Sequence, residues 1–281
     1  MFARPLFFIA LLTATNVCAA PLSFRTVNLE ARADCIKEQN RDTSFCHELT
    51  AAYPRTGDKT LDAWALRRVQ QAVGSKNLTP KGLQAFWAKS QDVRETNQDN
   101  AERDSPCRLN YIRTLELEGQ TPHYAVFGEE DWTYACGGYG DGSHVFLVVK
   151  RGAVKPKALA LKDILLPNGR AKLNRLQKEA VAKDLVKYHS DFKEFASAAK
   201  ARAYLDQYGD KGFQGTDNWR FAKGGLLFLF HGSELGSRLL GAPEAYIPAV
   251  KLRGIVKPEI LREAAQYQIA PSILKQDKDA K

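Results

Sequence analysis

Between residues 107 and 151 the sequence alternates apolar and polar side chains in four short runs. The runs read "CRLNYIRTLELEG", "PHYAVFG", "DWTYACGG" and "SHVFLVVKRG". Alternation with a period of two is typical of strands that bury one face, and short connections rich in glycine suit hairpins. The segment 107–151 is therefore expected to form an antiparallel sheet.

Helical patterns precede and follow this predicted sheet. Apolar residues recur at helical spacing over 60–74, 79–93 and 171–189. Later, residues 218–232 read as a hairpin with a buried second strand, and 244–254 as a further strand. The order of helices, sheet, helices and sheet predicts an α+β fold in which an antiparallel sheet packs with helices.

The first twenty residues have the features of a secretory signal peptide. Arg4 supplies a positive start, Leu6 to Leu12 form an apolar run, and small residues up to Ala20 suit cleavage. This apolar run is too short to span a membrane, and no later stretch is long enough. The mature protein is therefore expected to be periplasmic or secreted, soluble and without a membrane span.

Export places the remaining cysteines in an oxidising environment, where disulfides form. These residues are Cys35, Cys46, Cys107 and Cys136. Four cysteines allow three pairings. We favour Cys35–Cys46 and Cys107–Cys136, because each pair closes a local loop.

The predicted domain organisation has four parts. They are a signal peptide (1–20), a mostly helical segment with a local disulfide (21–104), an α+β domain (105–260), and a helix end with a charged tail (261–281). The helical segment is expected to pack on the α+β domain or to be part of it. Two connecting stretches are predicted not to be helical, since 94–106 reads as a loop and 159–169 as a strand that enters a turn.

The charge of the chain bears on its partners. The formal net charge is +9 at pH 7, which favours anionic partners such as cell-wall polymers, lipid headgroups or an acidic protein. The same excess of lysine and arginine also serves solubility. Nucleic acid is not an expected partner of an exported protein.

The glycine cluster "CGGYGDGSH" at 136–144 raises the question of a phosphate or metal site. No lysine follows the glycines, which excludes the phosphate-binding pattern G-x-x-x-x-G-K-[ST]. A strand follows instead of a helix, which excludes the dinucleotide-binding pattern G-x-G-x-x-G. No two of the five histidines have the spacing of a zinc motif. A calcium ion needs several oxygen ligands, and four acids could supply them: Glu129, Glu130, Asp131 and Asp141. We favour the interpretation that these acids form an exposed acidic hairpin tip. We expect no cofactor and no metal.

Signals for catalysis are equally weak. "HGSELG" at 231–236 differs from the serine-hydrolase pattern G-x-S-x-G, because Glu234 holds the central position. No pair of carboxylates stands out for glycoside hydrolysis. The protein is expected to be non-catalytic, while a cell-wall glycan hydrolase or deacylase acting through His144 or His231 stays an alternative. A structural envelope protein is another.

Four segments in order carry a family resemblance. They are "YACGGYG" (134–140), "ALALKDILLP" (158–167), "WRFAKGGLLFLF" (219–230) and "GSELGSRLLGAPEAYIPAVKLRGIV" (232–256). With their spacing, they resemble the extracytoplasmic domain of the RsiV type, which occurs in lysozyme-sensing anti-sigma factors and in other exported proteins. The resemblance implies that the predicted α+β domain has this fold.

The resemblance also implies a class of partner. That partner is a lysozyme-like cell-wall hydrolase, which the protein would inhibit or give immunity against, or peptidoglycan itself. Gly232 and Ser233 stand where the family commonly has Pro-Tyr. The surfaces expected to bind are the hairpin 137–144 and the loop 231–241, and the candidate binding residues are Tyr139, His144, His231, Ser233, Glu234 and Arg238.

Overall fold

The computed structural model describes residues 20–37, 44–100, 107–135, 140–207 and 212–271. The predicted signal peptide, apart from Ala20, and almost all of the charged tail lie outside these residues. No helix within the described ranges is long and apolar enough to cross a membrane.

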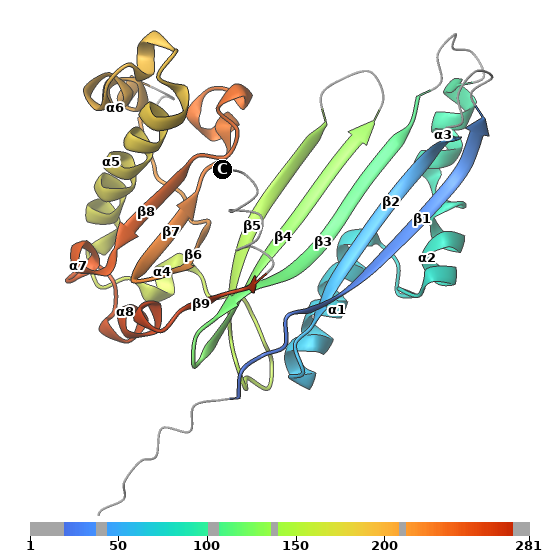
Figure 1. Ribbon diagram of the computed structural model, residues 1–281, viewed down its shortest axis with the longest axis horizontal. Helices are drawn as coiled ribbons and strands as arrows, with labels where there is room; N and C mark the ends of the chain where they lie inside the picture. Colours follow the sequence, from blue (N-terminus) through green and yellow to red (C-terminus); the bar gives the residue numbers. More distant parts are fainter. Residues whose placement is uncertain (1–19, 38–43, 101–106, 136–139, 208–211, 272–281) are drawn as a thin grey trace, which may run out of the picture.

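A six-stranded sheet forms the centre of the molecule (Figure 1). Its strands in spatial order are β1 (Arg25–Lys37), β2 (Ser44–Arg55), β3 (Leu109–Gln120), β4 (Tyr124–Ala135) and β5 (Asp141–Lys150), and the short β9 (Gln268–Ile269) pairs with the end of β3. The three strands β3, β4 and β5 are antiparallel, which confirms the sheet predicted over 107–151. Two runs predicted separately, 122–128 and 131–138, contribute residues 124–128 and 131–135 to one long strand, β4.

The expectation of a mostly helical N-terminal segment is wrong in its first half, where β1 and β2 form two long antiparallel strands. The sequence gives a weak strand signal here because several inward-facing side chains are alanines, such as Ala31, Ala33 and Ala51, and alanine is a poor strand former. Strand β2 pairs with β3 in parallel. The N-terminal segment is therefore part of the central sheet.

The predicted disulfide between Cys35 and Cys46 is confirmed, and it links β1 to β2. Cys107 is also disulfide-bonded. Because Cys136 lies outside the described residues, the pairing Cys107–Cys136 stays a prediction.

Three helices cover one face of the central sheet (Figure 1). They are α1 (Lys59–Val73), α2 (Pro80–Trp87) and α3 (Gln91–Asn100). The single helix predicted over 79–93 is divided, because α2 ends at Trp87 and the Ser90 hydroxyl accepts a hydrogen bond from the amide of Val93 at the start of α3. Part of the predicted loop 94–106 is therefore helical.

A second, three-stranded sheet lies beside the central one (Figure 1). It consists of β6 (Trp219–Ala222), β7 (Gly225–Leu229) and β8 (Glu244–Pro248), with α4 (Leu161–Ile164), α5 (Gly169–His189), α6 (Ala198–Gln207), α7 (Ala249–Leu252) and α8 (Pro258–Ala265) around it. The predicted hairpin and the long helix are confirmed. The strand predicted in 159–169 is wrong, since residues 161–164 form the helix α4, with Leu161 and Ile164 both buried at the spacing of one helical turn.

Strands β4 and β5 have buried residues on both faces. Phe127 and Leu147 pack toward α1–α3, whereas Val126 and Val148 pack into the core around the small sheet. Successive side chains along each strand point to opposite faces of the sheet. Two hydrophobic cores therefore share the strands β4 and β5. The α+β fold with a sheet packed against helices is thus confirmed.

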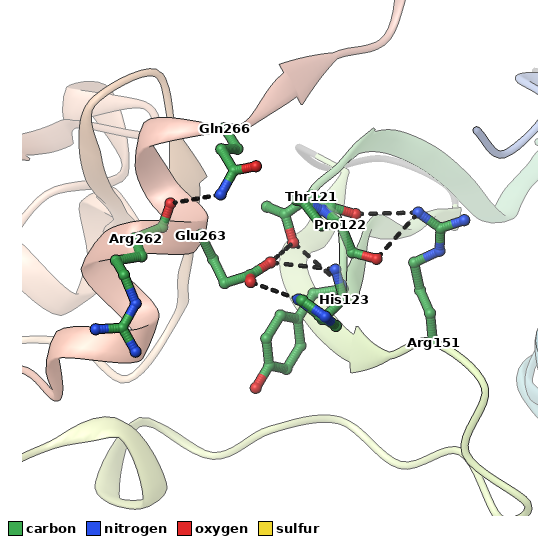
Figure 2. A network of polar contacts seen from close by, with 8 residues as sticks. Thr121, Pro122, His123, Arg151, Arg262, Glu263 and Gln266 are labelled. Carbon is green, nitrogen blue, oxygen red and sulfur yellow. Dashed lines mark hydrogen bonds and ion pairs between the residues drawn. The ribbon is translucent and has the colours of Figure 1, made fainter. Parts of the chain in front are cut away.

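A polar joint connects the two sheets near the turn between β3 and β4 (Figure 2). Glu263 of α8 accepts hydrogen bonds from the Thr121 hydroxyl at 2.5 Å and the His123 amide at 3.1 Å, and its other oxygen lies 2.6 Å from His123 Nδ1. Arg151 donates to the carbonyl oxygen of Thr121 at 3.1 Å. The joint fixes α8 to this end of the central sheet.

Candidate functional site

At the opposite end of β4 and β5 from the joint, a groove of about 940 Å³ opens between the central sheet and the loop that follows β7. One wall comes from β4 and β5, and the other from the loop 231–242. The lining residues include Glu130, Trp132, Tyr134 and His144 on the sheet, and His231, Ser233, Ser237, Arg238 and Leu239 on the loop.

The loop wall contains two short helical turns, η2 (Gly232–Leu235) and η3 (Arg238–Leu240). Leu235 and Leu240 anchor it, since both are buried in the core around the small sheet. The amide of Gly232 donates to the carbonyl oxygen of Gly241 at 2.7 Å and closes the loop. Leu239, which lies between these two anchors in the chain, is 78% exposed. The fixed loop therefore presents an apolar side chain at the groove.

The sheet wall follows from strand alternation. Glu130, Trp132 and Tyr134 of β4 share the face of Val126, and in β5 His144 lies opposite Glu130. A Cβ atom on Gly142 or on Gly140 would lie 2.6 Å or 2.0 Å from atoms of the Trp132 indole. The indole therefore lies against the backbone of β5, in a space that only glycine leaves open.

A buried charge cluster lies beside this wall. The Glu118 side chain is 8% exposed, and its Oε1 lies 3.0 Å from His144 Nε2. Its Oε2 lies 3.5 Å from Arg220 Nε, and Arg220 stacks over the Phe146 ring at 4.9 Å. A Cβ on Gly128 would fall 2.0 Å from Glu118 Oε1, so the carboxylate crosses β4 at a glycine to reach His144.

The cluster perturbs neighbouring groups. Burial, reinforced by the charges of Glu118 and Glu130, raises the pKa of Glu116. Burial raises the pKa of Tyr267 to about 12, with a further contribution from Glu118. Because an ionised Glu118 only accepts hydrogen bonds, it holds the proton of a neutral His144 on Nε2 and leaves Nδ1 as an acceptor.

Most of the predicted binding residues lie together. His144, His231, Ser233 and Arg238 line the groove, although the first is far in sequence from the other three. Glu234 is not among the lining residues; its carboxylate accepts a hydrogen bond from the His231 amide at 3.0 Å within the loop. Tyr139 lies outside the described residues.

The four acids weighed as calcium ligands do not gather. Glu129 pairs with Arg68, Asp131 with Arg113 at 2.8 Å, and Asp141 with Arg238 at 3.8 Å. Strand alternation directs Glu129 and Glu130 to opposite faces of the sheet. Within the part of the chain that the structure describes, no three His, Cys, Asp or Glu side chains are grouped to hold a metal ion.

Four residues at or beside the groove were not predicted from the sequence: Trp132, Tyr134, Glu118 and Arg220. A signal for two of them was present, because alternation over an uninterrupted β4 puts Glu130, Trp132 and Tyr134 on one face. Dividing β4 into two strands hid this register. Glu118 and Arg220 meet across two sheets, and no local pattern predicts such a contact.

Comparison with known proteins places the fold. No protein-family model matches the sequence, and no curated protein matches it either. A solved structure of a DUF3298 family member from Bacteroides fragilis aligns with a TM-score of 0.62 and 16% identity, over 86% of this chain and 97% of that one. A DUF3298 family protein from Pseudomonas aeruginosa PAO1 aligns with a TM-score of 0.52 and 16% identity, over 85% of this chain and 96% of that one. The chain thus shares the fold of DUF3298 family structures.

Proposed function

We propose that this chain is a non-catalytic binding protein of the periplasm or the extracellular space, and that its ligand enters the groove described above. Its RsiV-type resemblance, the predicted signal peptide and the disulfide between Cys35 and Cys46 support this role. The observation that carries the proposal is the meeting of two distant segments. His144 and the loop 231–241 form opposite walls of one groove.

The partner that we propose is a lysozyme-like cell-wall hydrolase, which the protein inhibits or gives immunity against. Leu239 and Trp132, which are 78% and 36% exposed, supply apolar anchors of the kind that dominate protein interfaces. Glu130 adds a carboxylate to the sheet wall, on the face of β4 that also carries Trp132. A carboxylate at this place complements a cationic group on the partner.

A second candidate is a glycan hydrolase or deacylase, and the pair of Glu118 and His144 favours it. A buried carboxylate that orients an imidazole is a recurring arrangement for a general base. The groove would then bind substrate instead of a protein. Turnover of wall fragments that His144→Gln abolishes is the result that would distinguish this candidate.

The test is a pull-down from an extract of exported proteins, combined with a muramidase assay at equimolar protein. The expected result is copurification of a wall hydrolase and loss of its activity. Arg238→Ala is expected to weaken capture, whereas the matched control Tyr246→Ala, which removes a 45% exposed aromatic residue that does not line the groove, is expected to leave it unchanged. Absence of binding to any muramidase and to peptidoglycan sacculi would refute the proposal.

A further inference from the structure

We infer that the groove binds an oligosaccharide of β-linked hexopyranose units, neutral or amino sugars, with Trp132 as the stacking platform. This inference rests on the proposed function in taking the groove as the ligand site, and it assigns the groove a saccharide ligand beside the protein partner proposed above.

The platform is a flat aromatic surface with one side already covered. Gly140 and Gly142 leave room for the indole of Trp132 against the β5 backbone, as their hypothetical Cβ positions show. The residue is still 36% exposed and lines the groove. A hexopyranose with equatorial substituents has an apolar face of axial C–H groups, and such a face packs on an aromatic ring, whose π surface is electron-rich.

Hydrogen-bonding groups flank the platform along the same strand. Glu130 and Tyr134 lie two residues before and after Trp132, so all three face the groove at a spacing of about 7 Å. His144 lies directly opposite Glu130, with its orientation fixed by Glu118. A sugar ring on Trp132 therefore has a carboxylate, a phenol and an imidazole within reach of its hydroxyl groups.

The opposite wall supplies complementary donors. Ser233, Ser237 and Arg238 line it, and hydroxyl and guanidinium groups donate to ring hydroxyls and to the carbonyl of an N-acetyl group. Few but convergent polar groups around an aromatic surface are the usual composition of a small-molecule site.

Size and charge narrow the class of ligand. A volume of about 940 Å³ lies near the upper end of the range of ligand pockets, so the groove has room for more than one ring. Glu130, which shares the face of Trp132, disfavours an anionic group on a sugar stacked there through like-charge repulsion. Neutral or amino-sugar units remain, as in the glycan strands of a cell wall.

The test is calorimetric titration of the full mature chain with the β-1,4-linked tetramer of N-acetylglucosamine, together with tryptophan fluorescence. Trp132→Ala is expected to weaken binding about tenfold or more, since an aromatic stacking contact and its buried area contribute at that level. Glu130→Gln is expected to weaken it severalfold while keeping the fold. Tyr246→Ala is the matched control and is expected to bind like the wild type, with thermal melts confirming that each variant is folded.

The outcomes separate this inference from the proposed function. Equal affinity of wild type and folded Trp132→Ala would overturn the inference. The same holds if the tetramer does not bind while a wall hydrolase still copurifies through Arg238, and the proposed function would then stand. Tetramer binding without capture of any hydrolase would support the inference and refute hydrolase inhibition, and hydrolysis of the tetramer would support saccharide binding and refute the non-catalytic role.

Discussion

Near each end of β4 and β5 a polar contact links the central sheet to an element beside the small sheet, α8 at one end and η3 at the other, and the two contacts differ in their burial. At the joint, Glu263 is 8% exposed and its carboxylate interacts with Thr121 and His123 at 2.5–3.1 Å. Across the groove, Arg238 and Asp141 are 3.8 Å apart with side chains 70% and 81% exposed. One end is closed by a buried, fully engaged carboxylate, and the other is open to solvent.

This difference indicates which end contributes more to the stability of the fold and which end can bind a ligand. A buried carboxylate with three partners holds the elements that meet there, because removing it leaves donors without partners. An exposed ion pair contributes little to the fold. The exposed pair of Arg238 and Asp141 can therefore open for a ligand at little cost to the fold, while the joint keeps α8 fixed to the central sheet.

The largest expected effect is at the joint. Glu263→Ala removes the acceptor for the Thr121 hydroxyl and for His123, and we expect it to lower the free energy of unfolding by about 3 kcal/mol, as for the loss of a buried, hydrogen-bonded charge. Urea unfolding measures this change. A loss comparable to that of Arg238→Ala would contradict the contrast between the two ends.

The joint also predicts a pH dependence. Burial alone would raise the pKa of Glu263, but hydrogen bonds from Thr121 and His123 lower it below its ordinary value of 4.5. Since the folded pKa is depressed, the stabilisation is complete above pH 4.5 and is lost as the pH falls through the folded pKa. Unfolding curves of the wild type and Glu263→Gln should converge in acid and separate near neutrality. A constant difference between pH 3 and 7 would contradict this assignment.

The charge cluster beside the groove gives a smaller effect with a sharper control. Gly128→Ala places a Cβ where Glu118 Oε1 lies, and we expect a loss of about 2 kcal/mol from the displaced carboxylate. In a Glu118→Ala background the same change should cost much less, because the carboxylate that it displaces is gone. A double-mutant cycle measures the coupling, and additive effects would show that Gly128 does not serve Glu118.

The sequence predicted the elements whose patterns are local. The alternation in β3 and β5 and the helical spacing in α5 are strong signals, and the local disulfide Cys35–Cys46 follows from loop length and compartment. Strands β1 and β2 were missed because alanines fill their inner face. The extra length of β4 was missed because glycine and acids near its centre resemble a turn.

The candidate site could be predicted only in its loops. Glycine and short polar side chains mark both hairpin 137–144 and loop 231–241 as exposed, and the structure brings residues 140–144 and parts of loop 231–241 to one groove. The contact of Glu118 with His144 and Arg220 depends on how two sheets pack and on a bulge after Leu117. Such contacts between distant residues leave no periodicity in the chain.

The smallest expected effect on stability is at the groove. We expect Arg238→Ala and Asp141→Ala each to change the free energy of unfolding by less than about 0.5 kcal/mol, with a coupling no larger, because both side chains are highly exposed. The same substitutions should change ligand capture more than they change stability, since their side chains line the groove. Denaturation of the two variants and their combination measures the coupling. A coupling above about 1 kcal/mol would mean that the pair holds the two walls of the groove together without a ligand. Both ends of β4 and β5 would then be held by polar contacts that stabilise the fold, and not only the end at the joint.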